Sequence, residues 1–135
     1  MNTTALSTTW APRLLSVLRI MAGLLFLAHG TQKLLGFPPR MGGGGAPELF
    51  SLIGLAGLLE LVGGALIVLG LFTRPVAFLL SGQMAVAYFM AHAPKSPFPA
   101  LNGGDAAILF CFVFLYLAAA GAGPWSLDAQ RRGRF

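Results

Sequence analysis

One stretch of the sequence, "FLAHGTQKLLGF" at 26–37, places three polar side chains within about one helical turn of an apolar run. His29 and Lys33 are four residues apart and Gln32 is three from His29, so all three project from the same side of a helix. Histidine exchanges protons near neutral pH, and lysine donates hydrogen bonds and carries a positive charge. These residue types suit the binding of a polar headgroup and proton transfer, and their spacing predicts one site.

A buried acid is expected to complete that site. Glu60 lies near the middle of a second apolar run, where a carboxylate is costly unless it is paired or protonated. Glu60 is therefore either a neutral hydrogen-bond donor or the partner of a cation such as Lys33, and the sequence leaves both open. We take His29, Lys33 and Glu60 as the candidate catalytic residues.

Further polar residues are expected around the same cavity, in the outer half of the protein. The candidate cofactor-binding residues are His29, Gln32, Lys33, Gln83, Tyr88, His92, Asn102 and Asp105. Structural alternatives exist, because Lys33 can snorkel to the interface, His29 can bond a neighbouring helix, and His92 lies near a loop. No metal site is expected, since the single cysteine, Cys111, excludes cysteine-ligated zinc and iron-sulfur clusters.

The elements that position these residues are predicted to be membrane-spanning helices. Of the 135 residues, 56% are hydrophobic and only 10% are charged, which is too little charge for the surface of a soluble domain. Spanning a bilayer takes about 20 apolar residues. Four runs approach that length, at 14–35, 49–72, 75–91 and 105–120. We predict an all-α membrane protein: a four-transmembrane-helix bundle forming one domain over 1–135, with a basic C-terminal tail at 121–135.

Glycine, proline and acidic residues mark the ends of these runs. "GGGG" at 42–45 and "NGG" at 102–104 lie in the predicted loops, while Pro75 and Asp105 stand where the third and fourth helices begin, Asp105 as an N-cap. Small residues such as Gly30 and Gly64 allow helices to approach closely.

The distribution of basic residues predicts the orientation. Six arginines fall on the side of the two termini, against Lys33, Arg40 and Lys95 on the other side, so both termini are expected in the cytoplasm. Arg19 is expected to snorkel towards that interface. The net charge of +5 is matched by anionic lipid headgroups, and no nucleic-acid partner is expected.

Residues along nearly the whole chain resemble the pattern of the DoxX family of small bacterial membrane proteins. In the first run they are Arg19, Gly23, Phe26, His29, Gly30 and Lys33. Further along they are Gly63, Pro75, "NGGD" at 102–105 and "GAGPWSLD" at 121–128. The resemblance implies a multi-pass protein of the bacterial inner (plasma) membrane, in a group related to DoxD-type subunits of thiosulfate:quinone oxidoreductases. It supplies no catalytic set, and Asp105 stands where the family commonly has Glu.

The leading hypothesis is a quinone-interacting subunit of a membrane redox system, because a quinone needs an apolar slot with a few polar groups at its carbonyls. His29 and Lys33 would bond the headgroup and Glu60 would carry protons. The chain has no flavin, dinucleotide or iron-sulfur motif, so electrons must come from a redox partner protein or another cofactor, and the chain is not expected to be a complete enzyme.

Three alternatives remain open. A haem b version would use His29 and His92 as axial ligands. A small proton or solute transporter or channel would use Glu60, Lys33 and His29 along its path, and would need a homo-oligomer because four helices enclose little space. A noncatalytic membrane anchor would recruit a redox enzyme.

Overall fold

The computed structural model describes residues 2–40, 42 and 44–132. Its elements, in chain order, are α1 (Thr3–Ala5), η1 (Leu6–Trp10), α2 (Ala11–Leu35), α3 (Leu52–Leu69), α4 (Thr73–Ala87), η2 (Tyr88–His92), α5 (Pro99–Asn102), α6 (Asp105–Ala120) and α7 (Leu127–Arg132). The elements η1 and η2 are π-helical turns. Because the described residues contain no strand, the predicted all-α class is confirmed.

The first helix is longer than predicted. It begins at Thr3 rather than at position 14, and α1, η1 and α2 together form a continuous helix of 33 residues. Proline lacks the N–H that a helix interior needs, and Pro12 lies at the start of α2. The preceding π-helical turn, closed by the bond from Ala11 N to Leu6 O, brings the chain into α2 at that proline without ending the helix.

Local capping explains two other differences from the predicted helix ends. α3 is shorter than the run at 49–72, because the Ser51 hydroxyl accepts a hydrogen bond from Gly54 N at its start and Gly70 adopts the left-handed conformation after its end. The predicted N-cap at Asp105 is wrong. Asp105 is the first residue inside α6, Gly104 occupies the N-cap position, and no side chain caps the helix.

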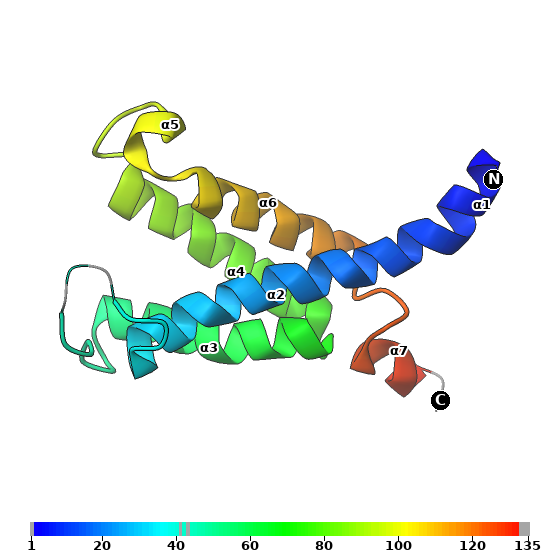
Figure 1. Cartoon of the computed structure of the whole chain (residues 1–135), viewed down its shortest axis with the longest axis horizontal. Helices are drawn as coiled ribbons and strands as arrows, with labels where there is room; N and C mark the ends of the chain where they lie inside the picture. The colour runs from blue at the N-terminus through cyan, green and yellow to red at the C-terminus, as the bar shows by residue number, and fades with distance from the viewer. Residues whose placement is uncertain (1, 41, 43, 133–135) are drawn as a thin grey trace.

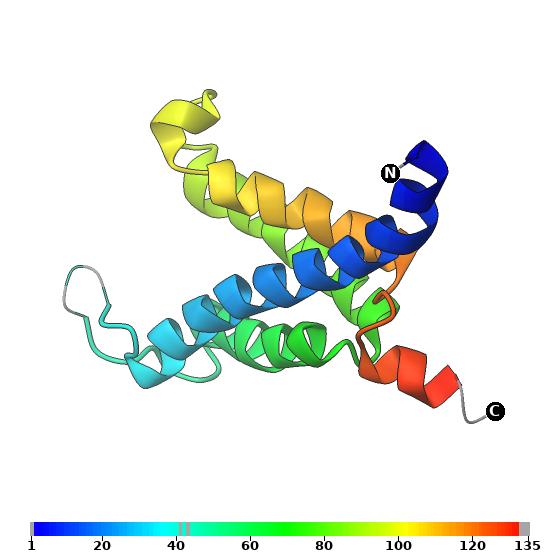
Figure 2. The same ribbon diagram turned by 45° about the vertical axis from the view of Figure 1, so that its right-hand side comes forward.

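The helices form two antiparallel pairs, α2 with α3 and α4 with α6 (Figure 1). Both views show the pairs crossing and then diverging towards the end that carries α5 and the loop between α2 and α3 (Figures 1 and 2). We call this the loop end, and the opposite end, with the N-terminus and α7, the terminal end. Where the pairs meet, Phe26 and Phe114 are fully buried with ring centroids 5.0 Å apart, beside Ile67 and Leu80.

Glycines bring α2 and α3 into backbone contact. A Cβ atom at Gly30 would lie only 2.5 Å from Leu61 N, and one at Gly64 would lie 2.9 Å from the Cα of Leu27. No side chain fits at such distances, so the close approach depends on glycine.

Three helical segments are long and apolar enough to cross a membrane: Thr3–Leu35, Leu52–Leu69 and Thr73–His92. α6 is equally apolar in character but has 16 residues, about 24 Å at the usual helical rise. Many apolar side chains point outwards, and Leu25, Phe78 and Phe112 are each more than half exposed. Lipid is the solvent that such a surface requires. The structure therefore contains three to four helices able to span a bilayer.

Much of the segment predicted as a basic tail is folded. After α6 the chain turns back across the terminal end, and α7 lies beside the turn between α3 and α4 (Figure 2). Residues 133–135 of the predicted tail lie outside the described ranges.

Candidate functional site

A buried ion pair joins α2 to α3. Lys33 Nζ lies 2.6 Å from Glu60 Oε1, and the Glu60 side chain is 3% exposed while that of Lys33 is 35% exposed. Gly57, one turn before Glu60, lies close to Lys33, since a Cβ atom there would be 3.2 Å from the Lys33 Cβ. Of the two interpretations of Glu60, the structure therefore shows the carboxylate as the partner of Lys33.

Two buried acceptor atoms, one on α3 and one on α4, lack donors within the described ranges. Glu60 Oε2 and Gln83 Oε1 are buried and, among the described residues, neither has a hydrogen-bond partner. Gln83 Nε2 donates to the Ala56 carbonyl at 3.3 Å, which ties α4 to α3 one turn from Glu60. A buried acceptor without a donor is costly, so these atoms are the part of the structure most suited to receiving hydrogen bonds from a bound molecule.

The other two polar residues of the first stretch face elsewhere. Gln32 Nε2 donates to the Pro39 carbonyl in the loop after α2, at 3.0 Å. His29 is exposed on α2, and its ring lies edge-on to Phe110 of α6 with centroids 6.2 Å apart. Consecutive helical residues differ by about 100° around the axis, and this rotation is enough to send Gln32 and Lys33 to different neighbours.

Tyr88, His92 and Asn102 form a second polar cluster at the loop end of α4 and α6. His92 Nδ1 lies 3.0 Å from the Asn102 carbonyl, and Asn102 Nδ2 donates to Tyr88 Oη at 3.2 Å and to the Ser96 carbonyl at 2.9 Å. Asn102 is 2% exposed and its Oδ1 accepts from Gly104 N. These bonds hold the loop between η2 and α6 in shape.

The structure thus places the predicted site residues in separate groups. Lys33 of α2 and Gln83 of α4 each bond α3, at Glu60 and at the Ala56 carbonyl, whereas Tyr88, His92 and Asn102 bond one another. The contacts of His29 and His92 are in different places, which gives no support to a shared haem. Across the described ranges, no three His, Cys, Asp or Glu side chains are grouped as metal ligands would be.

Sequence reasoning missed a more extensive polar centre at the terminal end. Arg19 was expected to snorkel to the interface, but it is 1% exposed. Its guanidinium donates to Ile67 O at 2.9 Å, Val68 O at 3.4 Å, Trp125 O at 2.8 Å and Ala122 O. The first two acceptors are at the C-terminal end of α3, where a cation is favoured by the helix dipole. Arg19 therefore fastens the C-terminal segment to the first helix pair.

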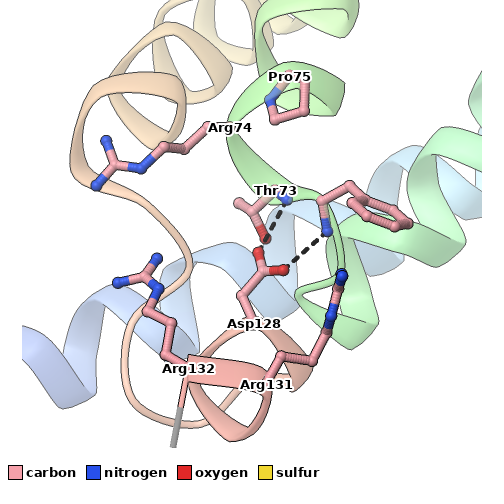
Figure 3. A pocket seen from close by; sticks show the side chains of 7 residues that line it. Thr73, Arg74, Pro75, Asp128, Arg131 and Arg132 are labelled. Atoms are coloured by element: carbon pink, nitrogen blue, oxygen red, sulfur yellow. Dashed lines mark hydrogen bonds between the residues drawn. The ribbon is translucent and has the colours of Figure 1, made fainter. Parts of the chain in front are cut away.

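Asp128 fastens the same segment to the second pair. Its carboxylate accepts from Phe72 N at 2.9 Å and Thr73 N at 3.0 Å, at the start of α4 (Figure 3). Burial alone would raise the pKa of Asp128, but these hydrogen bonds, the nearby Thr73 hydroxyl and the charge of Arg132 outweigh burial and hold the pKa below its usual range. The "GAGPWSLD" stretch, which carries part of the resemblance to the DoxX family, was the available signal.

Two cavities also lie at the terminal end, with volumes of about 320 and 560 Å³. The smaller is formed by the start of α4 and by α7, and the larger by α2, the end of α6 and the C-terminal segment. Neither of these two cavities is lined by Lys33, Glu60 or Gln83.

Comparison with known proteins agrees with this architecture. The family model of DoxX matches residues 14–93, more than half of the chain. An uncharacterised protein of Haemophilus influenzae is 43% identical over 122 residues, covering 88% of this chain and 91% of its own length. An uncharacterised membrane protein of Mycobacterium tuberculosis is 30% identical, covering 84% of this chain and 78% of its own. No solved structure matches. The chain is a membrane protein and belongs to the DoxX family.

Proposed function

We propose that this protein is a quinone-interacting subunit of a redox system in the bacterial inner membrane, with four spans and both termini in the cytoplasm. The observation that carries the proposal is the Lys33–Glu60 ion pair, with Glu60 Oε2 buried in an apolar protein and without a hydrogen-bond partner in the described part of the chain. An ionisable pair at this depth is costly and is retained where it serves a function.

The residues around the pair match the polar atoms of a quinone headgroup. A quinone, when bound, would supply two-electron and two-proton chemistry. Lys33 Nζ would donate to a carbonyl oxygen of the oxidised form. Glu60 Oε2 and Gln83 Oε1 would accept from the hydroxyls of the reduced form, since both atoms lack donors. Glu60 would take up or release the proton at Oε2.

The path to this site would run between the helix pairs. The two helix pairs diverge towards the loop end (Figure 1), and His29 of α2 is exposed with its ring edge-on to Phe110 of α6. His29 would exchange protons there and bond the headgroup as it enters. Gln32, Tyr88, His92, Asn102 and Asp105 would shape the loop end around it. Electrons would come from a partner protein, so this subunit would not be a complete enzyme.

The test is the quinone content of the intact protein purified gently from its membrane. We expect an oxidised-minus-reduced ultraviolet difference spectrum of quinone in wild type that is lost in Glu60→Gln. Glu48→Gln is the matched control, because Glu48 is exposed and lies in the loop before α3. The control should keep the signal.

Other results would overturn the proposal. A Glu60→Gln protein that is folded and retains its quinone would remove Glu60 from the site. Haem bands in the visible spectrum would favour the haem version. A featureless spectrum from folded wild type would favour transport or anchoring, and Glu60-dependent flux in proteoliposomes would then distinguish these two.

A further inference from the structure

The cavity of about 320 Å³ at the terminal end is rich in positive charge. It is lined by Phe72, Thr73, Arg74, Pro75, Asp128, Arg131 and Arg132. Figure 3 shows Arg74 and Arg132 on one side of Asp128 and Arg131 on the other. Three guanidinium groups around a single carboxylate leave the cavity positive, and so suited to an anion.

The arginines keep donors available. Arg74 Nη1 donates to the Ala118 and Ala119 carbonyls at the end of α6, which holds the side chain in place while its other N–H groups remain. The Arg131 guanidinium lies over the Phe72 ring, 4.8 Å from its centroid. Among the described residues, neither Arg131 nor Arg132 forms a salt bridge or a hydrogen bond, so their forked donors are free to bind a phosphate oxygen.

Thr73 provides a second indication that a ligand belongs here. The residue is 1% exposed and lines the cavity, and its Oγ1 has no hydrogen-bond partner within the described ranges, although it lies near the Asp128 carboxylate. The backbone N–H groups of Phe72 and Thr73 already donate to the Asp128 carboxylate, so they are not available to a ligand. The arginines are therefore the donors that the site still offers to an anion.

The position of the cavity indicates the source of that anion. It lies at the end that carries both termini, where Trp10 and Trp125 are half exposed, as tryptophans are at the level of lipid headgroups. We propose that this cavity binds a phosphate group, supplied by the headgroup of an anionic phospholipid or by free phosphate. The inference is independent of quinone binding, because no residue of the Lys33–Glu60 region takes part.

The test is native mass spectrometry of the full chain in detergent, titrated with phosphatidylglycerol, phosphatidylcholine or inorganic phosphate. We expect phosphatidylglycerol to bind more tightly than phosphatidylcholine, and Arg132→Gln to weaken its binding about tenfold, as expected for a lost charge-assisted contact. Arg13→Gln is the matched control. Arg13 is exposed at the same end, beside the Trp10 ring and outside the cavity, so the control should bind like wild type.

The arms of the experiment separate the two sources. Arg132-dependent binding of phosphatidylglycerol but not inorganic phosphate supports the lipid, and the reverse result supports free phosphate. Equal losses in Arg13→Gln and Arg132→Gln, with both proteins folded by circular dichroism, would overturn the site in favour of general charge attraction. Arg132→Lys keeps the charge but lacks the fork, and it should bind more tightly than Arg132→Gln.

Discussion

We predict that removing Lys33 and removing Glu60 from the ion pair lower the unfolding free energy by different amounts. Removing one partner of a buried ion pair costs about 3–5 kcal/mol of unfolding free energy, because the other charge stays buried. Lys33→Met leaves Glu60, 3% exposed, without the only donor that it has among the described residues. Since the lysine itself is 35% exposed, solvent screens part of the interaction, and we expect a loss of about 2–3 kcal/mol.

The opposite change should cost less. Glu60→Gln leaves a lysine that can turn its flexible stem towards water, so we expect a loss of about 1 kcal/mol. In the double variant no buried charge remains, and the loss should be about 1–2 kcal/mol rather than the sum of the two single losses. The coupling energy between Lys33 and Glu60 is therefore expected to be about 2 kcal/mol.

These free energies can be measured by unfolding purified protein in mixed micelles with increasing sodium dodecyl sulfate, followed by circular dichroism. Lys95→Met is the matched control, because Lys95 is an exposed lysine in the loop before α5. Single losses that add to within about 0.5 kcal/mol in the double variant would refute the reasoning, as would a Lys33→Met loss equal to that of the control.

Three further predictions concern other parts of the fold. Arg19→Met should lower the unfolding free energy by about 3–5 kcal/mol in the same titration, because it removes four guanidinium hydrogen bonds, two of them buried and two part-buried; a loss no larger than that of Lys95→Met would contradict this. Gly30→Ala should cost about 1–3 kcal/mol because its Cβ would meet backbone, whereas Gly82→Ala, with open space around it, should cost nothing comparable. The ionised Asp128 carboxylate, whose pKa is lowered on folding, stabilises the docking of α7. This contribution is fully present above pH 3.8, the ordinary pKa, and is lost as the pH falls through the lower pKa of the folded protein. Hydrogen exchange at 122–132 should therefore be faster in Asp128→Asn than in wild type at neutral pH, and the difference should disappear in acid.

The helices were predictable because their signals are local. Apolar runs and the glycines and prolines between them predicted the class, and the cost of a carboxylate inside the membrane singled out Glu60 and suggested Lys33 as its partner. The ends were less predictable. The first helix continues through Pro12 because a π-helical turn precedes it, and α3 starts where Ser51 caps it. Both features depend on the local backbone conformation, which the pattern of apolar residues does not specify.

The polar contacts at the terminal end were not predictable for a different reason. The acceptors of Arg19 are backbone carbonyls, which every residue carries, so side-chain patterns contain no trace of them. His29 contacts Phe110 and His92 contacts Asn102, and this separation of the two histidines likewise depends on how the helix pairs diverge. Helix rotation and pair packing are tertiary properties, and spacing within one helix does not specify them.

The hydrogen bonds of Arg19 also impose an order on biosynthesis. Two of its acceptors, Ala122 and Trp125, lie 103 and 106 residues further along the chain, so the ribosome adds them after all the long helices. Until then the nascent first hairpin holds a cation in the membrane with only the carbonyls of α3 to receive it. Translation of the segment after α6 is thus the step that completes the hydrogen bonds of the first long helix. A chain interrupted before that step would leave Arg19 with only the two α3 carbonyls as acceptors.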